Sequence, residues 1–334
     1  MSSKSTYKKP VAVVGAGSFG TAVANILANN NQVLLYARKP EVAKEISKTR
    51  ISAGQKINDK ITPVHDLEVI GKECEVIFPI IPSPFFRDLM RNFSPYLKPY
   101  HILIHGTKGI NISEGEEESD ELSIDDIFTM SRIIREESLV LRIGCLAGPN
   151  LSKELADGQP AATVVASHFD EVIKEGQKLL RSDNFQVYGS KELLGIELCG
   201  VLKNVIAIGA GALEGLGYGM NSRSLLISRG LIEMIYLGQL LGANTQAFLG
   251  LAGLGDLVAT CSSNLSRNYT VGKRMALGEN IKNILNTMDE IPEGVYTIKL
   301  LVKFKGKCQS CKNPISTGEY ALWSKSTKQI KHLD

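Results

Sequence analysis

The stretch from Val11 to Leu27, VAVVGAGSFGTAVANIL, constrains the fold more than any other part of this chain. Four apolar residues run directly into Gly15, Gly17 and Gly20, and a helical pattern of small residues begins at Thr21. This order predicts a buried strand, a tight turn and a helix N-terminus. The first glycine permits the turn, the second lets a diphosphate approach the backbone, and the third lets the helix pack closely on its strand. Because the motif follows a strand and opens a helix, we expect a dinucleotide site rather than an ordinary glycine-rich turn.

The composition bounds the class of protein. A chain of 334 residues has room for two domains, and its hydrophobic fraction of 43% is enough for a packed core. The net charge of +3, with acids interspersed among the basic residues, argues against nucleic acid or a membrane surface as a partner. The six cysteines lie mostly far apart and no apolar segment stands at the start, which favours a reducing cytoplasm over a disulfide framework.

The end of the second predicted strand, Gln32–Tyr36, bears on the choice of cofactor. An acidic residue about 20 positions after the glycines would bind the ribose 2′-hydroxyl of NAD, whereas an arginine can accommodate the 2′-phosphate of NADP. Here the strand is followed by Arg38 and Lys39, with no carboxylate before Glu41. The sequence therefore favours NADP, or use of both cofactors, and a solvated basic turn is the other interpretation.

Later apolar runs extend the predicted sheet to about residue 190. Glu75–Ile81 ends at Pro82, and His101–Ile104 leads into a loop that carries Lys108. Ligands in an open parallel sheet lie beyond the carboxyl ends of the strands, so both loops are expected near the cofactor, although a single lysine is more often an ordinary surface residue. Two further strands are predicted, at residues 139–146 and 161–166. The carboxylate-rich residues 114–126 lack the pattern of a calcium loop and are predicted to be a solvated insertion.

The second half contains one long apolar segment, Leu193–Leu213, with only two charged residues. A transmembrane helix is the first alternative at this length. The central charge, Lys203, and the many glycines and alanines favour a buried helix of a helical domain instead. Lys203 shares a helical face with Cys199, Ala207 and Ala210, so its amine has a lowered pKa if that face lines a cleft. The alternative is a lysine whose amine reaches solvent from an otherwise buried helix.

A glycine-rich turn then delivers Asp256, and Ser266, Arg267 and Asn268 follow within a dozen residues. Arginine and backbone donors suit a phosphate dianion, and a carboxylate can orient a lysine ammonium. This set suits a small phosphorylated polyol. Residues 262–264 are equally consistent with caps and turns between helices.

Six motifs in order carry a resemblance to a known family. They are GAGSFGTA (15–22), HGTKGI (105–110), AGPNLSKELADGQP (147–160), GVLKNVIAIGAGALEGLGYGMNSRSLLI (200–227), GLAGLGDLVATCSSNLSRN (250–268) and PEGVYT (292–297). Over roughly residues 11–300 the chain resembles the NAD(P)-dependent sn-glycerol-3-phosphate dehydrogenases of bacterial type. The resemblance implies interconversion of dihydroxyacetone phosphate and sn-glycerol 3-phosphate with NAD(P)H or NAD(P)+, in support of glycerolipid synthesis. It also implies a homodimer and a chemistry that needs no metal.

The resemblance further implies the site residues. Lys203 would accept the proton in oxidation and donate it in reduction, with Lys108 and Asp256 as its catalytic neighbours. The residues that would contact the substrate are Lys108, Gly148, Asn150, Lys203, Asp256, Ser266, Arg267 and Asn268. Those on the cofactor side are Gly15, Gly17, Ser18, Phe19, Gly20, Arg38, Phe86, Lys108, Ser152, Arg267, Ile291 and Glu293.

The chain departs from the family pattern in three places. Asn150 stands where many bacterial relatives have Ser or Thr, the acidic segment is long, and the tail after Leu301 differs from the expected helices. The tail contains Cys308-x-x-Cys311 and, later, His332. A structural zinc site normally has four ligands, often in two paired motifs, so the tail shows only half of such a site.

We therefore predict an α/β fold, a Rossmann-type doubly wound parallel sheet followed by an all-helical C-terminal domain. The predicted divisions are an NAD(P)-binding domain at 1–190, a helical substrate domain at 191–301 and an atypical tail at 302–334. Two functional alternatives stay open. One is a related hydroxyacid or ketoacid reductase on the same two domains, and the other is a nucleotide-binding protein made inactive by its tail.

Overall fold

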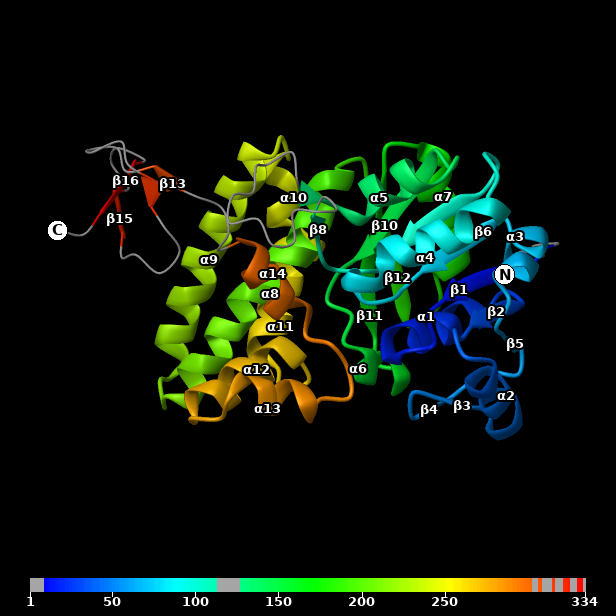
Figure 1. Cartoon of the computed structure of the whole chain (residues 1–334), viewed down its shortest axis with the longest axis horizontal. Coiled ribbons are helices and arrows are strands. Elements are labelled where there is room, and N and C mark those ends of the chain that lie inside the picture. Colours follow the sequence, from blue (N-terminus) through cyan, green and yellow to red (C-terminus); the bar gives the residue numbers. More distant parts are fainter. Residues whose placement is uncertain are drawn as a thin grey trace.

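The structure is a computed structural model that describes residues 9–112 and 127–301, followed by four short strands between residues 306 and 332. Figure 1 shows two parts side by side, a sheet covered by helices and a group of helices. The acidic segment and the two tail cysteines lie outside the described residues, so the solvated insertion and the zinc site stay predictions. The division into three domains also stays a prediction.

Eight strands form one sheet, and in spatial order they are β12 (Phe185–Ser190), β11 (Ala161–Ser167), β10 (Arg142–Ala147), β7 (Ile102–His105), β6 (Val76–Pro79), β1 (Val11–Val14), β2 (Val33–Tyr36) and β5 (Ile61–Val64). Neighbouring strands run parallel except β10 and β11, which are antiparallel. The strand order reverses at β1, which pairs with β2 on one side and with β6 on the other. Ligands of open α/β sheets bind beyond the strand ends at such a switch point.

Helices cover both faces of this sheet. They are α1 (Ser18–Ala28), α2 (Pro40–Thr49), α3 (Leu67–Glu73), α4 (Phe86–Phe93), α5 (Met130–Glu137), α6 (Ser152–Ala156) and α7 (Asp170–Leu180). Alternate residues of β1 enter different cores, because Val11 and Val13 pack on the side of α1, α2 and α7 while Ala12 and Val14 pack on the side of α3, α4 and α5. Burial on both faces explains why the strand is a continuous apolar run. The predicted doubly wound sheet is confirmed.

Several short elements complete the described backbone. The two-stranded hairpins are β3 (Ile51–Ser52) with β4 (Gln55–Lys56), β8 (Asn111–Ile112) with β9 (Ile127–Phe128), β13 (Gly306–Lys307) with β14 (Pro314–Ile315), and β15 (Ala321–Ser324) with β16 (Gln329–His332). Single helical turns lie at η1 (Ser83–Phe85), η2 (Ser94–Tyr96) and η4 (Leu251–Gly255).

Two predicted element starts were wrong by three residues. Helix α1 begins at Ser18 rather than Thr21, because Gly17 already serves as its extended N-cap residue. Strand β10 begins at Arg142 rather than Leu139, and the side chains of Leu139 and Leu141 are exposed. An apolar run predicts a strand only where its residues are buried, and these two leucines are not.

The second part is helical, as predicted. Its helices are α8 (Leu193–Gly215), α9 (Met220–Leu240), α10 (Thr245–Leu249), α11 (Asp256–Ser262), α12 (Arg267–Ala276), α13 (Ile281–Asn286) and α14 (Glu293–Leu301). Helix α8 lies at the centre, against α9, α11, α12 and α14. Within the described residues it is the one helix long and apolar enough to cross a membrane, and most of its apolar window is buried inside the protein. The predicted buried helix is confirmed.

Helices α8 and α12 cross with their backbones in contact. A Cβ atom on Gly211 would lie 1.9 Å from the carbonyl oxygen of Tyr269, and one on Gly272 would lie 1.8 Å from that of Ile208. Only glycine permits this approach. The small residues of α8 therefore serve close helix packing, as the sequence indicated.

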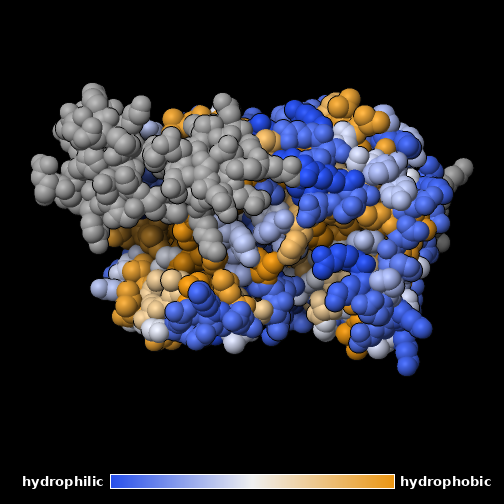
Figure 2. Space-filling model, viewed as in Figure 1, coloured by the Kyte–Doolittle hydropathy of each residue, from blue (hydrophilic) through white to orange (hydrophobic). Residues whose placement is uncertain are grey.

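Helix α9 is the least covered long helix of this part. Only Gly230, Met234 and Gly238 are buried among its 21 residues. Large apolar side chains are exposed at Met220, Leu225, Ile232 and Leu240. Figure 2 shows hydrophobic residues on the surface of the helical part, in the region where Figure 1 draws α9.

Candidate active site

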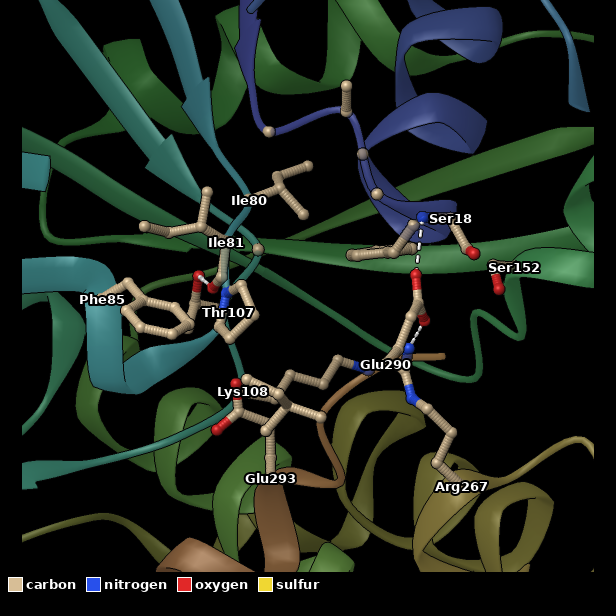
Figure 3. A pocket seen from close by; sticks show the side chains of 18 of the residues that line it. Ser18, Ile80, Ile81, Phe85, Thr107, Lys108, Ser152, Arg267, Glu290 and Glu293 are labelled. Carbon is tan, nitrogen blue, oxygen red and sulfur yellow. Dashed lines mark hydrogen bonds and ion pairs between the residues drawn. The ribbon is translucent and has the colours of Figure 1, made fainter. Parts of the chain in front are cut away.

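A cavity of about 880 Å³ lies between the carboxyl end of the sheet and the helical part. Its walls come from the glycine-rich turn, the loops after β6 and β7, the start of α6, helix α8, and the chain from Thr260 to Asn268. The segment before α14 closes one side, as Figure 3 shows with Glu290 and Glu293. The cavity therefore lies at the switch point of the sheet, where ligands of such folds bind.

The glycine-rich turn has the geometry of a dinucleotide-binding turn. Gly15 has φ +131°, and a Cβ atom there would lie 2.1 Å from the carbonyl oxygen of Ile80. A Cβ atom on Gly20 would lie 1.9 Å from the carbonyl oxygen of Gly15. Gly17 has an ordinary φ of −78° and stands as the N-cap residue of α1. The first and third glycines are thus needed for the turn itself, while the second opens the helix N-terminus toward the cavity.

Two lysines converge on one buried carboxylate. The Nζ atom of Lys203 lies 2.5 Å from Oδ1 of Asp256, and the Nζ atom of Lys108 lies 2.8 Å from Oδ2 of the same residue. Lys203 also donates to the hydroxyl oxygen of Thr260 at 2.7 Å, and Lys108 donates to the carbonyl oxygen of Gly148 at 3.0 Å. Residues 108, 203 and 256, far apart in sequence, thus form a single cluster.

Burial and the neighbouring charges shift the pKa values of Lys203 and Asp256. Burial lowers the pKa of the Lys203 amine to about 7, opposed by the attraction of Asp256 and assisted by the positive charge of Lys108. Burial alone would raise the pKa of Asp256, but the two lysines hold it below its usual value. A lysine poised near neutrality can both take and give a proton, which an ordinary surface lysine cannot.

Helix α8 also fixes the position of the Lys108 loop. Asn204 donates to the backbone oxygen of Lys108 at 3.3 Å, and a Cβ atom on Gly200 would lie 3.3 Å from the Lys108 side chain. Deeper in the protein, His105 at the end of β7 lies 2.9 Å from Glu197 of α8, and both are buried. The loop that carries Lys108 is therefore held against the helix that carries Lys203.

The start of α12 forms another wall of the cavity. Ser266 is the N-cap residue of α12 and accepts a hydrogen bond from the backbone N–H of Tyr269. Asn268 accepts one from the backbone N–H of Gly294, and Arg267 forms an ion pair with Glu290. The sequence left open that residues 262–264 serve as helix caps and turns. The helix cap is Ser266, whereas Ser263 stabilises the turn, because its hydroxyl accepts a hydrogen bond from the backbone N–H of Leu265.

Known proteins match this chain over nearly its whole length. The family description "NAD-dependent glycerol-3-phosphate dehydrogenase N-terminus" matches residues 10–173, and the corresponding C-terminus description matches residues 192–333. A glycerol-3-phosphate dehydrogenase (NAD(P)+) of Pseudomonas aeruginosa is 41% identical over 322 residues, which are 95% of this chain and 91% of the relative.

The chain belongs to the NAD-dependent glycerol-3-phosphate dehydrogenase family. Solved structures agree with this assignment. The glycerol-3-phosphate dehydrogenase of Coxiella burnetii superposes with a TM-score of 0.80 at 29% identity, covering 88% of each chain. The Saccharomyces cerevisiae enzyme shares the fold with a TM-score of 0.75 at 24% identity, covering 89% of this chain and 90% of that one.

Most residues that the family resemblance placed at the site do line the cavity. These are Gly15, Gly17, Ser18, Phe19, Gly20, Arg38, Lys108, Asn150, Ser152, Lys203, Ser266, Arg267, Asn268, Ile291 and Glu293. Asp256 and Gly148 lie behind the lining, where each accepts a hydrogen bond from Lys108. Which of these residues touch substrate or cofactor stays a prediction.

Phe86 lies elsewhere. Its side chain is fully buried on the α3–α5 side of the sheet, beside Met90 and Phe93. Its neighbour Phe85 is half exposed and lines the cavity. Phe86, which we predicted on the cofactor side, therefore does not line the cavity, whereas Phe85 does. The cause is the single helical turn η1 before α4, which changes the face that each residue presents.

Three site residues were given no role by the sequence analysis. Thr260 follows Asp256 by four residues, so helical spacing on α11 could have paired them. Asn204 directly follows Lys203 and could have been singled out as a buried polar residue of an apolar helix. Glu290 carried no local signal, since its partner Ser18 lies 272 residues away.

Proposed function

We propose that this chain is an NAD(P)-dependent sn-glycerol-3-phosphate dehydrogenase that interconverts dihydroxyacetone phosphate and sn-glycerol 3-phosphate. The observation that carries the proposal is the Lys203–Asp256–Lys108 cluster facing a cavity that also contains a dinucleotide-type glycine turn. Family membership supplies the substrate class. The residues present fit the cofactor, because Gly15 and Gly20 form the turn and Gly17 places no side chain at the N-terminus of α1.

The nicotinamide ring, when bound, supplies or accepts the hydride. The chain's own residues manage the proton and the charge. In reduction the Lys203 ammonium donates a proton to the carbonyl oxygen as it gains negative charge, and in oxidation the neutral amine accepts the hydroxyl proton. Asp256 holds the two lysines in place, and the Lys108 ammonium adds positive charge beside the developing alkoxide.

Two residues are suited to hold the substrate. Arg267 offers a guanidinium for the phosphate group at the start of α12, a pairing that arginine makes with two parallel hydrogen bonds. Asn150 donates to the backbone oxygen of Ala162, while its own Oδ1 is buried without a hydrogen-bond partner among the described residues. That oxygen is free to accept a hydrogen bond from a substrate hydroxyl.

The deciding experiment is a spectrophotometric assay of the purified protein with dihydroxyacetone phosphate and either NADPH or NADH. We expect oxidation of the nicotinamide with both, and faster oxidation of NADPH because Arg38 lines the cavity where an NADP-type site requires a cation. Turnover with a 2-ketoacid but not with dihydroxyacetone phosphate would favour the related reductase. Binding of NADPH without any turnover would favour the inactive nucleotide-binding protein.

The pH dependence of the two directions should be opposite. Reduction needs the Lys203 ammonium, so its kcat/KM falls about tenfold per pH unit above a pH of about 7. Oxidation needs the neutral amine, so its kcat/KM rises up to that pH and then levels. Rates measured from pH 5.5 to 9 in both directions test this. The substrate phosphate titrates near a pH of about 6 and affects both directions alike, so parallel profiles would contradict the role of Lys203.

Replacing Gly17 by alanine should weaken cofactor binding without unfolding the protein. The added Cβ would meet no described atom closer than the Glu290 oxygen at 3.5 Å, but it would project into the space at the N-terminus of α1 where we propose that the diphosphate binds. We expect a Kd for NADPH about tenfold higher, which is ~1.4 kcal/mol. Gly219 is the matched control, since it is also the N-cap residue of a helix with an ordinary φ and open space around it. An equal loss of affinity in both variants would contradict the proposed approach of the diphosphate.

Family resemblance also supports a homodimer, and the exposed apolar side chains of α9 offer a surface for it. The scattered cysteines support a cytoplasmic location, and the four that the structure describes are free and buried. The product would supply glycerophospholipid synthesis. Sedimentation equilibrium of the purified chain measures the assembly state directly.

A further inference from the structure

The carboxylate of Glu290 lies at the N-terminus of α1. Its Oε1 atom accepts the backbone N–H of Ser18 at 2.8 Å and would lie 3.5 Å from a Cβ atom on Gly17. Its other oxygen pairs with the guanidinium of Arg267. Figure 3 shows Glu290 between these two partners, joined to each by a dashed line. One side chain thus connects the glycine-rich turn to the start of α12.

Both partners of Glu290 have another use in the proposed reaction. The first free N–H groups of α1 are the donors that a dinucleotide-binding turn offers to a diphosphate. Arg267 is the guanidinium suited to the substrate phosphate. A carboxylate and a diphosphate oxygen cannot accept the same Ser18 hydrogen at full strength, and their negative charges repel each other. Glu290 therefore has to leave when a dinucleotide binds there.

We propose that Glu290 is an internal anion that competes with the cofactor diphosphate for the N-terminus of α1 and, while bound there, holds Arg267 away from the substrate phosphate. Cofactor binding displaces the carboxylate and frees Arg267, so the phosphate site is completed only after the dinucleotide has bound. This inference rests on the proposed function for the identity of both ligands. Glu290 acts here as a positioning residue and takes no part in the chemistry.

The neighbouring residue Asp289 offers a matched control. It lies in the same segment before α14, lines the same cavity and carries the same charge. It is exposed and makes no hydrogen bond or ion pair with another residue that the structure describes. A general effect of negative charge on an anionic ligand would appear in both residues, whereas direct competition belongs to Glu290 alone.

The first test is the Kd of NADPH, measured by nucleotide fluorescence without substrate, for the wild type, Glu290→Gln and Asp289→Asn. Glutamine keeps the size of the side chain but loses the charge, so it competes less well. We expect the Kd to fall about tenfold in Glu290→Gln and less than about twofold in Asp289→Asn. An unchanged or higher Kd in Glu290→Gln, or an equal fall in both variants, would overturn the proposal. A wild type that does not bind NADPH would instead refute the proposed function, and this inference with it.

The second test follows Arg267. Without nucleotide, calorimetric titration with sn-glycerol 3-phosphate should show tighter binding to Glu290→Gln than to the wild type, because the guanidinium is released. The increase in Tm caused by saturating NADPH should also be larger in Glu290→Gln, since ligand stabilisation grows as Kd falls. Equal substrate affinity in the two proteins without nucleotide would show that Glu290 does not restrain Arg267.

Discussion

Replacement of Lys203 by alanine should lower kcat for dihydroxyacetone phosphate reduction by about 10²–10⁴-fold, the usual contribution of a general acid–base group. The reason is local, because the Lys203 amine is the buried cation whose pKa lies near neutrality and which faces the cavity beside Asp256. Lys108 stays in place through Asp256 and Gly148, so cofactor binding should be retained. The measurement is a steady-state assay with NADPH, accompanied by the Kd for NADPH.

The control for this loss is Lys282→Ala, which removes an exposed lysine on α13 outside the cavity lining. It should leave kcat unchanged. A Lys203→Ala variant with kcat within tenfold of the wild type and normal NADPH binding would show that another group handles the proton.

The largest effect on stability is expected for Asp256→Asn. The substitution removes the carboxylate that two lysines share in a buried position, and loss of one partner from a buried ion pair costs about 3–5 kcal/mol. Without the attraction of Asp256 the pKa of Lys203 falls further, so Lys203 in the folded variant takes up a proton less readily than Lys203 in the folded wild type. The added loss of stability therefore appears as pH falls below about 7, where the wild-type amine becomes charged.

Urea unfolding at pH 6 and pH 9 measures this difference. The free energy of unfolding should drop more at pH 6 than at pH 9. The double variant Lys203→Met with Asp256→Asn removes one of the two stranded charges and should recover part of the loss. A loss independent of pH, with no recovery in the double variant, would show that Asp256 stabilises the fold by packing alone.

The sequence predicted those features whose signal lies in residues close together in the chain. The glycine turn, the buried strands and the apolar helix α8 each have a local pattern, and each was found close to where the pattern placed it, apart from the first residues of α1 and β10. The spatial order of the strands had no such signal, nor did the antiparallel junction of β10 and β11, because strand pairing is decided between segments far apart in the chain.

The active site was likewise predicted where the signal is local in the sequence, and missed where it depends on contacts between distant segments. Lys203 and Asp256 were each singled out, but spacing alone could not show that one carboxylate serves two lysines from different elements. Phe86 was assigned to the cofactor side through the family resemblance, and the sequence does not show a one-residue difference in helical phase before η1 and the start of α4 are known. Glu290 was missed entirely, since its role exists only once the chain has brought it back to Ser18.

The crossing of α8 and α12 through Gly211 and Gly272 sets a length scale for the substrate. Lys203 lies roughly two turns before one glycine and Arg267 lies between one and two turns before the other. The backbone contact between the helices therefore fixes how far apart the backbone positions of Lys203 and Arg267 lie, the two residues proposed to handle the proton and to bind the phosphate. Under the proposed function, the spacing that suits a small phosphorylated substrate depends partly on two glycines that do not line the cavity.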